Sequence, residues 1–185
     1  MLLRLILLGL LVQMPIAQAA CRIELQEWSG GVDTVADLLS LAARDFNRTS
    51  QRLDVEYVGV IGPGQNDGRL RSTAGKGCPG SDGFSLSVAD LQGAVGLWHT
   101  HGSAGPFRRY FSPSDADLVR HTGLPLYLIT ADNQVRVLTT EAVRKAPSKL
   151  RRFGSRVLAY GYPGQQVVLR PARSGSGRAL AVQQR

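Results

Sequence analysis

The sequence predicts an α+β fold in which helices flank a single mixed β-sheet. Its 185 residues are enough to bury one hydrophobic core and too few for two full domains. Short apolar runs rich in β-branched residues are bounded by glycine and proline, which is typical of strands. Other segments repeat their apolar residues at helical spacing. We therefore expect one domain with one functional site.

Several apolar or alternating segments have the length and composition of strands. The second of them is β-branched and ends at Gly62, Pro63 and Gly64. The next stretch, 62–82, is rich in glycine and lacks apolar periodicity, which predicts a long loop or an irregular hairpin pinned by Cys78. The predicted strands cover residues 22–28, 55–61, 94–98, 124–130 and 135–139.

Two segments carry helix signals. Asp33 can cap a helix whose apolar stripe consists of Val35, Leu38, Leu39, Ala42 and Phe46. The polar residues 47–51 then predict a turn. Ser112 and Pro113 are a typical helix opening, with serine as the cap and proline in the first turn, and this helix is expected to end near His121.

Residues 1–20 are typical of a secretory signal peptide. Arg4 is followed by an apolar run over 5–12 and by small residues at 17, 19 and 20. The run is shorter than the ~20 residues of a spanning helix, so we expect cleavage, no membrane span in the mature chain, and a periplasmic or secreted protein. Lipid anchoring at Cys21 is the alternative, although Gln18 stands where a lipobox has an aliphatic residue.

Cleavage before Cys21 leaves two cysteines, Cys21 and Cys78, in an oxidising compartment. We expect them to form a structural disulfide. Their spacing contains no CxxC and gives no metal signature.

The chain is basic, with a formal net charge of +8. Arginine and lysine are concentrated in 144–156, and residues 166–185 are predicted to be a basic disordered tail that follows the domain at 21–165. Basic runs are usually solvated surfaces, and neither interleaved aromatic residues nor a known reading motif supports nucleic-acid binding. Anionic components of a bacterial envelope are a more fitting contact.

The segment His99-Thr100-His101 leaves an apolar strand. Residues two apart on a strand share a face, so both imidazoles can reach one metal ion. Two histidines on a half-exposed strand would give the same pattern without a metal. Trp98 and Tyr110 are predicted to be core or wall residues, and His121 a surface or core histidine, because it lacks the required spacing.

Ser112 and Asp115 form an SxxD unit at a helix start, a short loop after the histidine pair. Asp115 can be the third metal ligand there. The competing interpretation is a capping box, in which Ser112 caps the helix and Asp115 reaches back to its amide. The co-occurrence of a carboxylate, Glu56, in an earlier β-branched strand favours a metal site.

Together these residues resemble the JAMM, or MPN-plus, metalloprotease family, whose pattern is an ExxGxL-like strand followed by HxHP and SxxD. Here Glu56 with Gly59, the histidine pair, and the Ser112–Asp115 unit match it over roughly residues 33–140. Residues 96–138 are similar to a bacterial branch of uncharacterised domains found in exported and polymorphic-toxin proteins. Gly102 departs from the pattern, because it stands in place of the proline, and the loop that follows is a few residues longer than in the deubiquitinating members.

The resemblance implies a cytidine-deaminase-like MPN architecture and a zinc-dependent amide hydrolase, a peptidase or isopeptidase. His99, His101 and Asp115 would bind Zn²⁺ and leave one position to water. Glu56 would be the general base, and Ser112 would stabilise the oxyanion. Asp117 is a nearby substitute for Asp115, although it should face another way on the helix.

Two other functions remain open. One is a non-catalytic MPN-like scaffold or binding module of the bacterial envelope, since several members of this fold lack metal. The other is a basic binder of envelope components or nucleic acid through 144–156 and the tail. For the hydrolase, export argues against ubiquitin and leaves envelope proteins, peptidoglycan crosslinks or a competitor's proteins as peptide or isopeptide substrates.

Overall fold

A computed structural model describes residues 23–79, 84, 86–103, 105, 108–145, 149–153, 156–162, 164–169 and 182–184. The predicted signal peptide, 1–20, and Cys21 lie outside the described residues. Within the described part of the chain, every helix is too short or too polar to cross a lipid bilayer.

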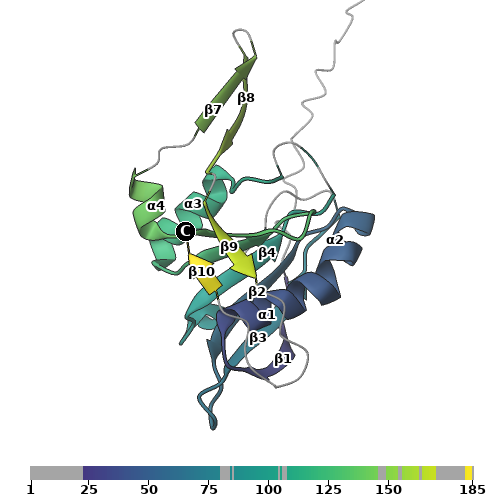
Figure 1. Cartoon of the computed structure of the whole chain (residues 1–185), viewed down its shortest axis with the longest axis vertical. Helices are drawn as coiled ribbons and strands as arrows, with labels where there is room; N and C mark the ends of the chain where they lie inside the picture. The colour runs from purple at the N-terminus through teal and green to yellow at the C-terminus, as the bar shows by residue number, and fades with distance from the viewer. Residues whose placement is uncertain are drawn as a thin grey trace, which may run out of the picture.

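The fold is α+β, as predicted, and is built on one mixed sheet (Figure 1). The described strands of this sheet run in the order β1-β3-β2-β4-β5-β6-β9-β10. Their bounds are β1 Gln26–Val32, β2 Tyr57–Pro63, β3 Leu70–Lys76, β4 Gly96–Thr100, β5 Leu126–Ile129, β6 Val135–Leu138, β9 Gln165–Leu169 and β10 Val182–Gln184. Among these, β4 and β5 are parallel, and the other neighbours are antiparallel. A separate hairpin, β7 (Lys149–Phe153) and β8 (Arg156–Gly161), extends away from the sheet (Figure 1).

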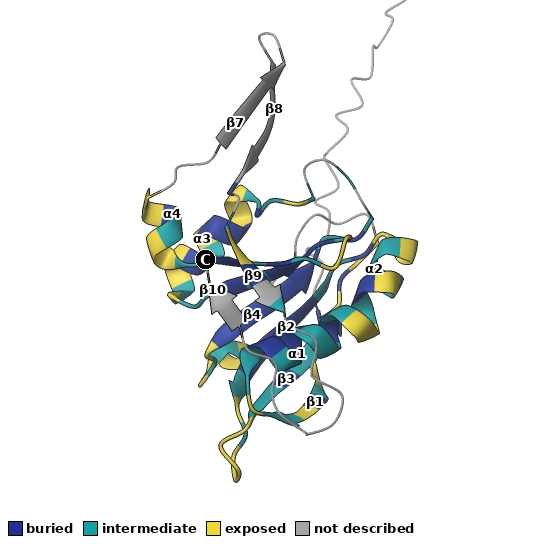
Figure 2. Ribbon diagram, in the orientation of Figure 1, coloured by how far each residue is buried: buried dark blue, intermediate teal, exposed yellow. Residues whose placement is uncertain are grey.

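The helices cover both faces of the sheet. The first face packs against α1 (Val35–Ala42), which is followed by the π-helical turn η1 (Ala43–Asn47) and by α2 (Arg48–Leu53). The opposite face packs against α3 (Pro113–Thr122) and α4 (Thr140–Lys145). A short 3₁₀ turn, η2 (Ala89–Leu91), precedes β4. The central strands are therefore buried on both sides (Figure 2).

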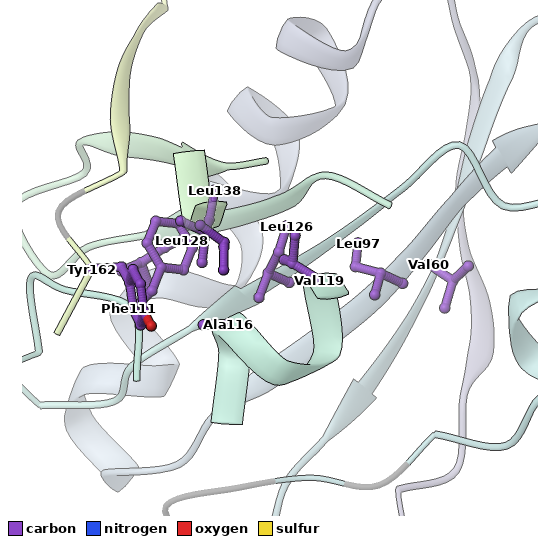
Figure 3. Packing of buried hydrophobic residues seen from close by; sticks show 10 residues of the cluster. Val60, Leu97, Phe111, Ala116, Val119, Leu126, Leu128, Leu138 and Tyr162 are labelled. Carbon is purple, nitrogen blue, oxygen red and sulfur yellow. The ribbon is translucent and has the colours of Figure 1, made fainter. Parts of the chain in front are cut away.

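Each face has its own apolar core. On the α1 face, Leu38 and Leu39 pack against Trp98 and Ile129. On the α3 face, Ala116 and Val119 of the helix lie over Leu97 and Leu126 of the sheet (Figure 3). The alternation along β4 thus directs Trp98 to one core and Leu97 and His99 to the other.

Gly59 allows β2 to lie close to the Trp98 indole. A Cβ added at Gly59 would lie 2.2 Å from the Trp98 Nε1 and 2.2 Å from the Thr73 carbonyl oxygen. The indole N–H donates instead to the Ser72 hydroxyl, at 2.8 Å. Gly59 belongs to the sequence pattern that includes Glu56. In the structure, its lack of a side chain leaves room for the indole of Trp98 on the neighbouring strand β4.

Several sequence predictions need correction at the N-terminal half of the chain. Residues 47–51, predicted as a turn, lie in α2 or at its start, because the Asn47 amide is buried and donates to the Thr130 carbonyl, at 2.9 Å. The side chain of Thr34, rather than Asp33, caps α1 by accepting from the Asp37 N–H, at 3.1 Å. The first strand, predicted over 22–28 with a turn at 29–31, instead begins at Gln26 and continues to Val32. Irregular pairing with β3 between Glu27 and Val32 keeps residues 29–31 in the strand. Of the two structures predicted for the glycine-rich stretch, a long loop or an irregular hairpin, the structure has the hairpin, because β3 pairs with β2 in antiparallel orientation.

The C-terminal residues also differ from the prediction. The proposed disordered tail, 166–185, overlaps β9 and β10, which extend the sheet beyond β6. Val167 is buried in the core on the α1 face. Val167 and Leu169 supply apolar contacts that the arginine- and glycine-rich composition of the region does not predict.

Candidate metal centre

The two histidines lie at the carboxyl end of β4. His99 is the fourth residue of this strand and is fully buried, whereas His101 directly follows the strand and has a side chain that is 11% exposed. Their Nε2 atoms are 2.9 Å apart. The expectation that both imidazoles share one face and converge is confirmed.

Asp115 reaches the same point from the first turn of α3. Its side chain is 9% exposed, and its Oδ1 lies 3.6 Å from the His99 Nε2 while Oδ2 lies 3.8 Å from the His101 Nε2. The three residues place one potential ligand atom each within 4.8 Å of one another. This group could hold a metal ion.

The potential ligand atoms of this group lie close enough together to surround one metal ion. Ligand atoms about 2.0–2.1 Å from a tetrahedral zinc ion are about 3.4 Å apart. The Nε2 atoms of His99 and His101 are 2.9 Å apart, the Asp115 Oδ1 lies 3.6 Å from the His99 Nε2, and the Asp115 Oδ2 lies 3.8 Å from the His101 Nε2. Two imidazole nitrogens and one carboxylate oxygen also form a ligand set found in catalytic zinc sites with an open position. The donor types of the three residues are thus ones that a metal ion such as zinc binds.

A capping box holds Asp115 in place. The Ser112 N–H donates to the Asp115 Oδ2, at 2.6 Å, and the Asp115 N–H donates to the Ser112 hydroxyl, at 3.1 Å. The capping interpretation is thus correct, but it does not exclude a ligand role. Since the cap engages Oδ2, Oδ1 remains directed at His99. The helix cap fixes the carboxylate that faces the histidines.

The Ser112 hydroxyl also donates to the Asp115 Oδ2, at 2.9 Å. In this arrangement Ser112 positions the third ligand candidate. Asp117, two residues further on, is exposed and pairs with Arg120, so the helix directs it away from the histidines as predicted.

The protonation states of His99 and Asp115 suit metal binding at neutral pH, whereas the carboxylates around His101 favour its protonated form. Burial lowers the pKa of His99 to about 4, so this imidazole is neutral at pH 7 and has a free lone pair. Burial alone would raise the pKa of Asp115, but the two histidines and the Ser112 N–H hold it at about 2. Burial also lowers the pKa of His101, but the nearby carboxylates of Asp115 and Glu56 outweigh it and raise this pKa.

The second ring nitrogen of each histidine faces the protein. The His101 Nδ1 lies 3.0 Å from the carbonyl oxygen of Arg108, a geometry in which Nδ1 carries the proton and Nε2 is left as the ligand atom. The His99 Nδ1 is buried, and no acceptor in the described part of the chain meets hydrogen-bond geometry with it. The main chain of Tyr127 on β5 nevertheless lies close enough to raise the pKa of His99 slightly against burial.

Glu56 lies beside this group at the start of β2. The strand begins at Tyr57, one residue later than the glutamate, and its register places Val58 opposite His99. Val60 packs on the α3 side of the sheet, and alternation assigns Glu56 to that same side. The Glu56 charge helps to raise the pKa of His101, which indicates proximity. All five predicted site residues are therefore gathered at one end of β2 and β4.

The main chain of Glu56 is fixed by the end of β3. Its carbonyl oxygen accepts from the Gly77 N–H, at 2.7 Å. The next residue, Cys78, is disulfide-bonded. Cys21, the other cysteine of the chain, lies outside the described residues, and the predicted Cys21–Cys78 pairing stays a prediction.

Sequence reasoning missed the residues that support the end of β4. The Ser50 hydroxyl of α2 bonds the Thr100 hydroxyl, at 2.7 Å, and accepts from the Gly102 N–H, at 3.1 Å. The Thr100 hydroxyl in turn accepts from the Tyr57 N–H, at 2.9 Å. The polar residues of 47–51 predicted a turn, and nothing in their sequence signals the contact of Ser50 with the end of β4.

Trp98, Tyr110 and His121, for which the sequence predicted no role in metal binding, are not part of the group formed by His99, His101 and Asp115. Trp98 is a core residue, as predicted. Tyr110 is partly buried, with the Arg136 guanidinium 5.9 Å from its ring centroid. His121 is exposed, and its Nδ1 lies 2.7 Å from the Asp117 carbonyl oxygen of its own helix.

The metal-free protein is expected to lose stability as the pH falls from about 6 to about 4. In the unfolded chain, His99 takes up a proton near its ordinary pKa, but in the folded chain it resists protonation until about pH 4. The unfolded state then binds more protons, so acid favours unfolding. The raised pKa of His101 acts in the opposite direction, but its contribution is already complete below the ordinary histidine pKa.

Urea unfolding midpoints at these two pH values, measured with a chelator present, test this expectation. His121→Ala should keep the wild-type pH dependence, because that histidine is exposed. His99→Asn should reduce it. A wild-type pH dependence in His99→Asn would contradict the assignment to His99.

The three residues that could hold a metal ion thus stand next to the remaining two residues of the predicted site. Ser112 touches Asp115, and Glu56 acts electrostatically on His101. No protein-family model, curated protein or solved structure matches the chain, so no relative assigns a role to these residues.

Proposed function

We propose that the chain is a zinc-dependent amide hydrolase of the JAMM type, a peptidase or isopeptidase. The observation that carries this proposal is the convergence of His99, His101 and Asp115 from a strand end and a helix start. Helices on both faces of a mixed sheet support the MPN-like architecture. The partial exposure of His101 is consistent with an open coordination position.

The roles follow from the positions of the side chains. When bound, zinc would supply Lewis acidity that acidifies a water molecule and polarises an amide carbonyl. Glu56 would accept the proton of the attacking water and return it to the leaving amine. Such a role requires a carboxylate close to the ligands, and the contribution of the Glu56 charge to the raised pKa of His101 supports that proximity.

Ser112 has two roles in the proposal. In the structure the Ser112 hydroxyl donates to the Asp115 Oδ2 and accepts from the Asp115 N–H. Turned toward a substrate, the same hydroxyl would donate to the developing oxyanion, while the Ser112 N–H keeps its bond to the Asp115 Oδ2.

The proposed substrates are peptide or isopeptide bonds accessible outside the cytoplasm, because the proposal retains the predicted signal peptide. The basic segment at 144–156 would contact anionic envelope components.

The test is the metal content of the purified protein, measured by elemental analysis. Wild type and His121→Ala are expected to contain about one zinc per chain. The double variant His99→Ala, His101→Ala is expected to contain none. Wild type that takes up no zinc after incubation with it would overturn the hydrolase proposal in favour of a binding module.

A further inference from the structure

We infer that Asp54 and Arg108 form a clamp that positions His101 as a metal ligand. Arg108 contacts His101 twice. Its carbonyl oxygen lies 3.0 Å from the His101 Nδ1, and its guanidinium Nη1 donates to the His101 carbonyl oxygen. One residue therefore holds both the ring and the main chain of the most exposed ligand candidate.

Asp54 contacts the same guanidinium nitrogen that donates to His101. Its Oδ1 lies 2.9 Å from the Arg108 Nη1 and accepts from the Ser103 N–H, also at 2.9 Å. Asp54 ends α2 in the left-handed conformation, with φ of 48°, so its main chain is set by the helix end. The clamp thus connects α2 to the segment that leaves β4.

Gly102 leaves the space in which the clamp closes. Its φ is +64°, a conformation that glycine adopts without strain and that proline cannot adopt. A Cβ at this position would lie 2.7 Å from the Arg108 Nη1 and 2.7 Å from the Asp54 Oδ1. The glycine that departs from the JAMM pattern is therefore the residue that permits this contact.

The clamp matters for metal binding because of the histidine tautomer. A carbonyl that accepts from Nδ1 keeps the proton there, fixes the ring plane and leaves the Nε2 lone pair for a metal. Loss of the guanidinium would remove the donor to the His101 carbonyl oxygen, and we expect the His101 Nε2 to be held less firmly at its position 2.9 Å from the His99 Nε2.

The clamp is expected to contribute little to folding itself. The Asp54 side chain is 50% exposed and that of Arg108 is 33% exposed, and ion pairs at such positions are weak. Variants should therefore fold, which makes their metal affinity interpretable. The inference rests on the proposed function only in requiring that the wild-type protein binds zinc.

The test compares Arg108→Ala and Asp54→Asn with wild type and with Arg109→Ala. Arg109 is the adjacent arginine, 63% exposed, and does not contact His101 in the described structure. Zinc affinity is measured by competition with a chromophoric chelator. We expect it to fall about 10–100-fold in Arg108→Ala and less in Asp54→Asn, with Arg109→Ala unchanged.

The visible spectrum of the cobalt-substituted protein is the second measurement, because it responds to ligand geometry and not to global stability. The Arg108→Ala spectrum should differ from that of wild type, while the Arg109→Ala spectrum should not. Wild-type zinc affinity and cobalt spectra in both clamp variants would overturn the clamp and leave the proposed function intact. If Arg108→Ala does not fold, the zinc affinity and the cobalt spectrum of Asp54→Asn test the clamp. Absence of zinc binding in wild type would instead overturn the proposed function.

Discussion

Asp115→Asn is expected to lower the zinc affinity of the protein by more than about a hundredfold. The substitution removes the negative charge of a side chain that is only 9% exposed and faces both histidines. The asparagine oxygen can still accept from the Ser112 N–H, so the start of α3 should persist. Titration of the metal-free variant with zinc in the presence of a competing chelator gives the affinity.

Asp117→Asn is the matched control for this variant. Asp117 lies two residues further along α3, is exposed, and pairs with Arg120. The control variant should bind zinc as wild type does. If Asp115→Asn also kept the wild-type affinity, Asp115 would be a helix-capping residue alone, and the competing interpretation of the SxxD unit would be the right one.

Glu56→Gln is expected to reduce the rate of amide hydrolysis by about 10²–10⁴-fold while the zinc content stays at the wild-type level. Glutamine has nearly the shape of glutamate but cannot accept a proton from water at neutral pH. The Glu56 main chain would keep its bond to the Gly77 N–H, so the strand start should not move. Mass spectrometry of a cleaved peptide library, followed by kinetics on the best peptide, measures the effect.

Glu141→Gln serves as the control, because Glu141 is an exposed residue of α4 that pairs with Lys145. Its rate should equal that of wild type. Two outcomes would contradict the role of Glu56. Retained activity in Glu56→Gln would exclude it as the base, and loss of zinc together with activity would make it a ligand or a structural residue.

The ligand group could be predicted because its signals are local. His99 and His101 share a strand face, and Ser112 begins a helix three residues before Asp115, so short-range geometry directs all of these residues. The structure shows the capping box and leaves room for a ligand role of Asp115 beside it. The carboxylate has two oxygens, and the cap engages Oδ2 while Oδ1 faces His99.

The supporting residues could not be predicted, because their contacts connect distant parts of the chain. Asn47 is buried through a bond to Thr130, and this contact outweighs the turn-like composition of its segment. Asp54 and Arg108 meet only because α2 ends beside the carboxyl end of β4. Gly102 was the visible irregularity, but its meaning required the positive φ and the side chains around it.

The arrangement of β4, α3 and β5 has a consequence for how the site assembles. All three ligand candidates come from one continuous unit, in which β4 and β5 are parallel and α3 crosses between them. Glu56 comes from the start of β2, outside that unit. If the proposed function holds, the metal ligands and the proposed base belong to different parts of the sheet, so variation in the β1-β3-β2 half could abolish hydrolysis and still leave a protein that binds the metal.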